Sequence, residues 1–158
     1  MRPDPNAALR DLAASLLDED TPISRHVIDP TEEPFFGLLA SQGPKAATAP
    51  GEYAFVVEAV REGYLLHYGQ SRLLRGYDDD LALLAGDYLY ALGLERLAAL
   101  GDGESVAKLA ELIARSAQLH AEGRDAEAPE LWRAVALAIG DPPGRPESID
   151  SALPEASC

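Results

Sequence analysis

The chain has 158 residues, a length suited to one domain, and its 47% hydrophobic and 25% charged residues are ordinary values for a globular protein. Its 27 acidic and 13 basic residues give a formal net charge of −14, which repels phosphate backbones and anionic membrane surfaces and so disfavours nucleic acid as a partner. The only cysteine, Cys158, excludes a disulfide within one chain, and no stretch reaches the about 18 apolar residues of a membrane span. Residues 1–17 carry mixed charges and no apolar core of signal-peptide length, so we expect a cytoplasmic protein.

The first predicted helix covers residues 4–18. Asp4 can accept hydrogen bonds from the first turn, and Pro5 suits the first helical position. Residues 19–51 are rich in Pro, Gly, Thr and acidic side chains. They are predicted to form an extended connector with a short turn at the sequence PFFGLLA, residues 34–40. Residues 1–51 are thus an N-terminal helix and its connector.

Four more helices are predicted, over residues 51–68, 78–100, 104–122 and 128–139, and they make residues 52–140 the helical core. No run alternates apolar and polar residues, so the fold class is all-α, a helical bundle. Residues 141–158 are predicted to be a disordered tail. The side chains expected to face inward are Val56, Ala59, Val60, Gly63, Tyr64 and His67 on the second helix, Val106, Leu109, Ala110, Ile113 and Ala117 on the fourth, and Leu131, Trp132, Val135 and Ile139 on the fifth.

The helix over residues 78–100 is apolar nearly all round, which predicts a central helix covered by neighbours on every side. Gly86 and Gly93 lie seven residues apart on one face, where another helix can approach closely. Asp87 is the single charge between Leu81 and Leu94. Two interpretations are open for it: a buried carboxylate that accepts hydrogen bonds from a helix end, a Tyr or an Arg, or a site group that faces a cavity. The first is favoured.

Six tyrosines gather around the second and third predicted helices. An aromatic core whose hydroxyls reach polar partners is the favoured interpretation, ahead of a ligand box. These residues are Tyr53, Tyr64, Tyr68, Tyr77, Tyr88 and Tyr90.

The sequence LALLAGDYLYALGLERLAALGD, residues 81–102, resembles the trans-polyprenyl diphosphate synthase family. In that all-α fold, a central helix carries a leucine-rich segment that ends in Ala-Gly-Asp. The chain is most similar to the non-catalytic first component of heteromeric heptaprenyl diphosphate synthases, over about residues 52–120. The resemblance implies a truncated isoprenoid-synthase fold.

The segment EAVREGYLLHYGQSR, residues 58–72, departs from the active members of this family. It keeps Glu58 and His67 at the matching places. Tyr68 and Gly69 stand where the first two aspartates of the DDxxD motif are found, and Arg72 stands where the last one is found. The resemblance therefore implies that the first metal-binding motif is lost.

Two further motifs of the active enzymes are also lacking. The diphosphate-binding sequence Gly-Lys-Arg-x-Arg-Pro is echoed only by QGPKAATAPG, which keeps Lys45 and has no arginine. The chain ends before a second aspartate-rich motif.

The remaining acidic residues do not replace that metal site. Asp80 and Asp87 are about 10 Å apart along a helix, too far to share one ion. Glu58 and Glu62 have i, i+4 spacing, but without basic diphosphate ligands a solvent-exposed acidic face is the favoured interpretation. The three histidines, His26, His67 and His120, show no metal-ligand spacing. No catalytic residue, metal or cofactor is predicted.

The resemblance implies a catalytically silent protein that forms no prenyl product alone. It would be a small partner subunit that shapes the product cavity of a catalytic subunit in isoprenoid-quinone side-chain synthesis. We expect a dimer, homomeric or with a catalytic polyprenyl diphosphate synthase subunit. The candidate interface or cavity residues are Glu58, His67, Gly86, Asp87, Tyr88 and Gly93.

An alternative is a helical protein-interaction adaptor or homodimer with no role in prenyl chemistry. Residues 117–142 resemble a tetratricopeptide-type helical hairpin. One such unit cannot bury its own face, and no second copy is evident in the sequence.

Overall fold

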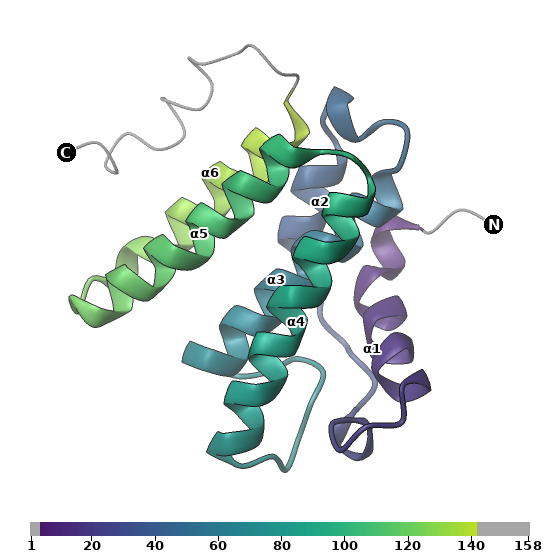
Figure 1. Ribbon diagram of the computed structural model, residues 1–158, viewed down its shortest axis with the longest axis vertical. Helices are drawn as coiled ribbons and strands as arrows, with labels where there is room; N and C mark the ends of the chain where they lie inside the picture. Colours follow the sequence, from purple (N-terminus) through teal and green to yellow (C-terminus); the bar gives the residue numbers. More distant parts are fainter. Residues whose placement is uncertain (1–3, 142–158) are drawn as a thin grey trace.

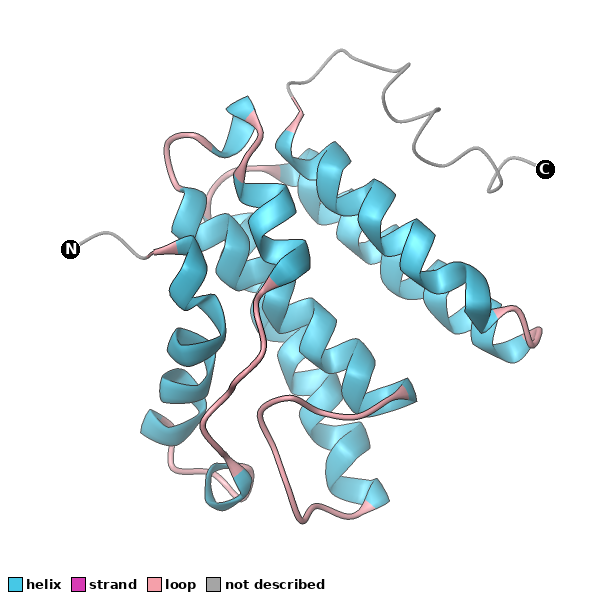
Figure 2. Cartoon of the chain, turned by 180° about the vertical axis from the view of Figure 1, so that it is seen from behind, coloured by secondary structure: helices cyan, strands magenta, loops and turns pink. Residues whose placement is uncertain are grey.

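The computed structural model describes residues 4–141, which form α-helices joined by turns and short 3-10 helices (Figures 1 and 2). The helices are α1 (Ala8–Asp18), α2 (Phe35–Ser41), α3 (Pro50–Tyr68), α4 (Asp79–Ala99), α5 (Gly103–Ala121) and α6 (Ala128–Gly140). This described part contains no strand, only one isolated antiparallel bridge between Val27 and Leu74. The all-α prediction is therefore confirmed for residues 4–141. The predicted disordered tail, apart from Asp141, lies outside them.

Local signals set the helix boundaries, and the predicted ones are confirmed to within a few residues. The Asp4 carboxylate accepts a hydrogen bond from the Asn6 N–H at 3.0 Å, although the first turn, Pro5–Ala7, is 3-10 rather than α. Asp78 caps α4 through the Leu81 N–H at 2.8 Å. None of the described helices combines the length and hydropathy needed to cross a bilayer.

The predicted extended connector is wrong, because residues 35–41 form α2 and pack against α3 and α6. Gly37 and Ala40, three residues apart, are buried on this face. A Cβ atom on Gly37 would lie 2.7 Å from the Ala54 carbonyl oxygen of α3. Small residues thus let a short helix approach the core closely, a packing that composition alone does not reveal.

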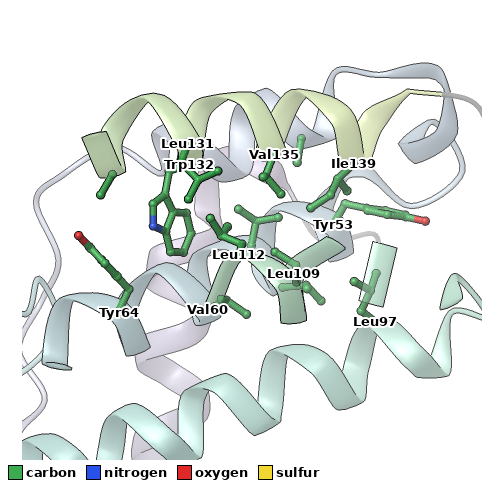
Figure 3. Close-up of a cluster of buried hydrophobic side chains, with 14 of the residues drawn as sticks. Tyr53, Val60, Tyr64, Leu97, Leu109, Leu112, Leu131, Trp132, Val135 and Ile139 are labelled. Atoms are coloured by element: carbon green, nitrogen blue, oxygen red, sulfur yellow. The ribbon is translucent and has the colours of Figure 1, made fainter. Parts of the chain in front are cut away.

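The central helix is α3, not α4. Every residue from 53 to 60 is buried. One hydrophobic cluster joins α3 to α5 and α6, and a second joins it to α1 and α4. Figure 3 shows the first cluster, with Trp132, Val135 and Ile139 of α6 packed toward Val60 of α3. By contrast, α4 is buried along one face only.

The inward faces of the last two helices are predicted with different success. All four residues predicted for α6 are buried. On α5, Leu109 is buried and Val106 and Ile113 are partly buried, but Ala110 and Ala117 are exposed. Larger leucines take the core positions instead, at Leu109, Leu112 and Leu119.

A network centred on Asp102 joins the start of α5 to α3 and to the 3-10 turn Pro44–Ala46. Its carboxylate accepts hydrogen bonds from the Tyr53 hydroxyl at 2.6 Å and the Ser105 hydroxyl at 2.7 Å, and pairs with Lys45 Nζ at 2.8 Å. Burial alone would raise the pKa of Asp102, but the hydrogen bonds from Lys45, Tyr53 and Ser105 outweigh it and hold the pKa well below its usual range. Lys45 therefore has a structural partner.

Glycines hold α3 and α4 in close contact. A Cβ atom on Gly93 would lie 2.7 Å from Val60 Cγ2 and 3.0 Å from the Val56 carbonyl oxygen, and one on Gly86 would lie 3.0 Å from the Gly63 carbonyl oxygen. The predicted close approach is confirmed, but α3 of the same chain provides it. Gly86 and Gly93, two of the candidate interface or cavity residues, therefore lie against α3 of the same chain.

Gly93→Ala is expected to lower the free energy of unfolding by about 2 kcal/mol, because the added methyl group overpacks the contact with Val56 and Val60. Gly103→Ala is the matched control, since no atom lies within 4 Å of its added Cβ. We expect this control to shift the free energy by no more than about 0.5 kcal/mol. Urea unfolding followed by circular dichroism measures both. Equal effects would contradict the close helix contact.

Asp102→Asn keeps an N-cap side chain but removes the charge, and we expect a loss of about 1–2 kcal/mol at pH 7. Because the folded-state pKa of Asp102 is lowered, its contribution is present above the unfolded value of about 4 and is lost as the pH falls. The difference from wild type should shrink between about pH 5 and pH 2 in urea titrations. Asp78→Asn, at the exposed cap of α4, is the control and should change stability less. A difference that is constant with pH would contradict the ionic role.

Candidate functional site

Two glutamates of α3 and one arginine form a buried charge cluster, which we call the Glu58–Arg72–Glu62 cluster. Both glutamate side chains are 0% exposed, so the predicted solvent-exposed acidic face is wrong. Arg72 Nη1 lies 2.8 Å from Glu58 Oε1, and Arg72 Nε lies 3.0 Å from Glu62 Oε1. The i, i+4 spacing puts both carboxylates on one face of α3, where one guanidinium reaches both.

The segment between α3 and α4 is folded around Glu62. Its Oε2 atom accepts hydrogen bonds from the backbone N–H groups of Arg72 at 2.9 Å and Leu73 at 3.3 Å, and from the Ser71 hydroxyl. The Ser71 oxygen in turn accepts from the Leu74 N–H at 3.0 Å. These bonds fix the loop that delivers the Arg72 side chain.

Glu58 ties a third element to the cluster. Its second carboxylate oxygen, Oε2, accepts a hydrogen bond from the Gly37 N–H of α2 at 2.8 Å. Burial raises the pKa of Glu58, and the Arg72 guanidinium opposes that rise. For Arg72, burial acts to lower the pKa, but attraction by Glu58 and Glu62 outweighs it and raises the pKa.

These contacts restrict what the cluster does chemically. A site for metal ions, or for a diphosphate held through metal ions, needs carboxylate oxygens that are open to the metal, whereas both carboxylates here are buried and engaged with Arg72 and backbone N–H groups. Over residues 4–141, no three His, Cys, Asp or Glu side chains are arranged to hold a metal ion. The arrangement is that of an internal ion cluster.

A row of aromatic rings runs beside this cluster and connects five helices. Successive ring centroids lie 4.1–5.9 Å apart. The Arg61 guanidinium lies over the Phe36, Tyr64 and Trp132 rings at 4.7, 5.0 and 5.0 Å. The row consists, in order, of Phe35, Phe36, Trp132, Tyr64, His120, Tyr68, His67 and Tyr90.

Three tyrosine hydroxyls have polar partners, as the interpretation of an aromatic core predicts. Tyr53 donates to Asp102, and the Tyr64 hydroxyl lies 2.8 Å from His120 Nε2. The Tyr77 hydroxyl accepts from the Ser71 N–H at 3.3 Å. Burial raises the pKa of Tyr64 and Tyr90. The row therefore contributes packing between helices.

The structure brings together three of the six candidate residues. His67 Nε2 lies 3.3 Å from Asp87 Oδ1, and Gly86 lies against His67. The Asp87 side chain is 74% exposed, so the prediction of a buried carboxylate is wrong. Asp87 lies on the outer side of α4, because Gly86, Leu89 and Gly93 occupy the side that packs on α3.

The other three candidates lie elsewhere. Glu58 belongs to the buried cluster, nine residues before His67 and so on the opposite side of α3. Tyr88 lies near the end of α1, where burial and the Glu19 carboxylate raise its pKa to about 12. Gly93 lies against Val56 and Val60. The six residues therefore do not form one site.

Sequence reasoning missed Arg72, Ser71 and Arg61 as members of buried networks. A usable signal was present: two glutamates one turn apart, followed four residues after the end of α3 by an arginine. This spacing indicates an ion-pair partner for the two glutamates. It does not indicate that the pair is buried, because burial depends on α2 and on the loop before α4.

Comparisons with known proteins assign no family to the chain. No protein-family model matches it, and no curated protein and no solved structure is significantly similar to it.

Arg72→Gln is expected to lower the free energy of unfolding by about 3 kcal/mol at pH 7, because two buried carboxylates lose their counter-charge. Adding Glu58→Gln should recover part of that loss, since it removes one of the uncompensated charges. Arg124→Gln is the control: its guanidinium binds Glu122 and Glu127 at the surface, and we expect no resolvable change. Urea titrations measure the free energy of unfolding of wild type and of the three variants. Equal losses for Arg72→Gln and Arg124→Gln would contradict the burial of the cluster.

Proposed function

We propose that the chain is a catalytically silent relative of polyprenyl diphosphate synthases, with a truncated isoprenoid-synthase-like bundle, that acts in the cytoplasm as a small partner subunit. It shapes the product cavity of a catalytic synthase subunit in isoprenoid-quinone side-chain synthesis. The observation that carries the proposal is Arg72. By resemblance it stands at the last aspartate of the metal-binding motif, and its guanidinium neutralises Glu58 and Glu62.

The chemistry of the cluster supports the absence of turnover by this chain alone. Prenyl synthases hold the substrate diphosphate through Mg²⁺ ions on accessible carboxylates. On α3 the two carboxylates that remain are occupied by Arg72 and by backbone N–H groups. Lys45, the one basic residue that echoes the diphosphate-binding sequence, is paired with Asp102. These side chains therefore offer no free carboxylate for Mg²⁺ and no free base for the substrate diphosphate.

The packing of α3 on α4 also supports the family relationship. The two segments that carry the resemblance, residues 58–72 and 81–102, are joined by a loop and lie side by side as antiparallel helices (Figure 1). Gly63 and Gly86 lie in the contact between them. The two segments on which the proposed relationship rests thus form one continuous packed unit.

A helical adaptor is the second candidate, and a groove on the α5–α6 hairpin favours it. The groove encloses about 250 Å³ and is mainly apolar, with Leu112, Leu131 and Val135 among its lining residues. The inner face of the hairpin, including Trp132, packs into the core. The hairpin is therefore part of the bundle, unlike a freely stacked repeat, and we rank this function second.

The test combines the purified chain with a full-length polyprenyl synthase that carries both aspartate-rich motifs and comes from the same organism. With Mg²⁺ and allylic and homoallylic diphosphates, the chain alone should form no product. The mixture should form a complex in sedimentation velocity and change the product chain length relative to the synthase with serum albumin. Turnover by the chain alone would overturn the silent assignment, and an unchanged product distribution would overturn the subunit role. A complex without a change in product would favour the adaptor.

A further inference from the structure

The outer side of α4 forms a continuous exposed strip. At 100° per residue its members fall within about one third of the helix circumference, opposite the face that packs on α3. In Figure 1, α4 lies in front of α3 with no other helix crossing over it. The strip, which we call the α4 outer strip, consists of Asp80, Leu83, Leu84, Asp87, Ala91, Glu95 and Ala98, all exposed.

The α4 outer strip is both apolar and acidic. Leu83 and Leu84 are 55% and 61% exposed, more than any other large hydrophobic side chain of the described residues. Ala91 and Ala98 present only methyl groups, which let another helix come close. The strip contains no lysine and no arginine. A helix face with exposed leucines and one sign of charge has the composition of a binding surface.

We propose that the α4 outer strip is the docking surface for a basic amphipathic helix of the partner protein. The inference rests on the proposed function and names the surface and the chemistry of the partner. The strip runs over 19 residues, about 27 Å of helix, which is long enough for a helix–helix contact of several turns. Its alanines accept large apolar side chains, and its leucines require small ones opposite them.

The spacing of the acidic residues specifies the partner further. Asp80, Asp87 and Glu95 recur at seven and eight residues, or about once every two turns. A partner helix with lysine or arginine at the same spacing places one base near each carboxylate. Asp87 is available for this contact because, although paired with His67, its side chain stays 74% exposed.

The same charges disfavour a second copy of this chain as the occupant. Two α4 outer strips packed together would bring six carboxylates into one contact, and neither strip contains a lysine or an arginine. Each chain also carries a formal net charge of −14. Like charges in one interface cost free energy, whereas a basic helix gains it, so the occupant is a different protein.

The experiment uses the full chain and two synthetic helical peptides with the same leucine and alanine positions. One peptide carries lysine at every seventh position and the other carries glutamate there. Fluorescence anisotropy of the labelled peptides should show micromolar binding of the lysine peptide, weakened by salt, and none of the glutamate peptide. Leu84→Glu should weaken binding about tenfold, whereas Leu137→Glu, at a 40% exposed leucine of α6, should leave it unchanged.

A charge reversal sharpens the result. In the variant Asp87→Lys with Glu95→Lys, preference should move from the lysine peptide to the glutamate peptide. No binding of the lysine peptide, or binding that Leu84→Glu and the charge reversal leave unchanged, would overturn the proposal. A homodimer in sedimentation velocity that Leu84→Glu dissociates would also overturn it, in favour of a second copy.

A parallel sedimentation assay with the synthase separates this inference from the proposed function. If the synthase binds wild type and Leu137→Glu but not Leu84→Glu, the result supports both the docking surface and the subunit role. If it binds all three equally, the docking surface is wrong and the subunit role remains. If the peptide results hold but the synthase binds none of the three, the surface stands and the synthase is the wrong partner.

Discussion

The structure depends on the burial of two carboxylates in its central helix. Glu58 and Glu62 are fully buried, and isolated buried charges would cost several kcal/mol each. Arg72 must therefore reach them from beyond the end of α3, which constrains the path of the loop before α4. The same loop hydrogen-bonds to the segment after α1 through Ile28 and Leu73 at 2.8 Å. The need to neutralise Glu58 and Glu62 thus links α2, α3 and the loop before α4, and that loop is in turn bonded to the segment after α1.

That coupling explains why α3 is central and α4 is peripheral. The cluster needs neighbours on the face of α3 that carries Glu58 and Glu62, and α2 and the loop provide them. The opposite faces of α3 are covered by α4 and by the α5–α6 hairpin. α4 packs through one face, which holds Gly86, Leu89, Gly93 and Leu97, so Leu83 and Leu84 on its outer side are left at the surface.

Local features of the sequence predict most of this fold, and nonlocal ones do not. The helix starts predicted at residues 51, 78 and 104 lie within one residue of the starts in the structure, because helix-start signals such as capping depend on neighbours a few residues away. Which helix is central depends on residues far apart in the sequence. The leucines and alanines around α4 show that this helix can be buried, but they do not show that other helices cover it. Likewise Glu58 and Glu62 have the pattern of a solvated pair until a guanidinium from outside the helix is placed between them.

The buried cluster and the exposed face of α4 both bear on the proposed function. In the proposed family relationship, Arg72 takes the place of a metal-binding acid, so an internal cation replaces an external one and the cluster keeps its charge balance without a ligand. Such a replacement would keep the helix packing around the cluster and remove the carboxylates that hold substrate through metal ions. The chain's remaining capacity to act on other molecules lies at the surface, and in this protein the most exposed large apolar residues of the described part lie on α4, among acids. The neutralised internal cluster and the exposed, acidic face of α4 are the two features on which the proposed subunit role rests.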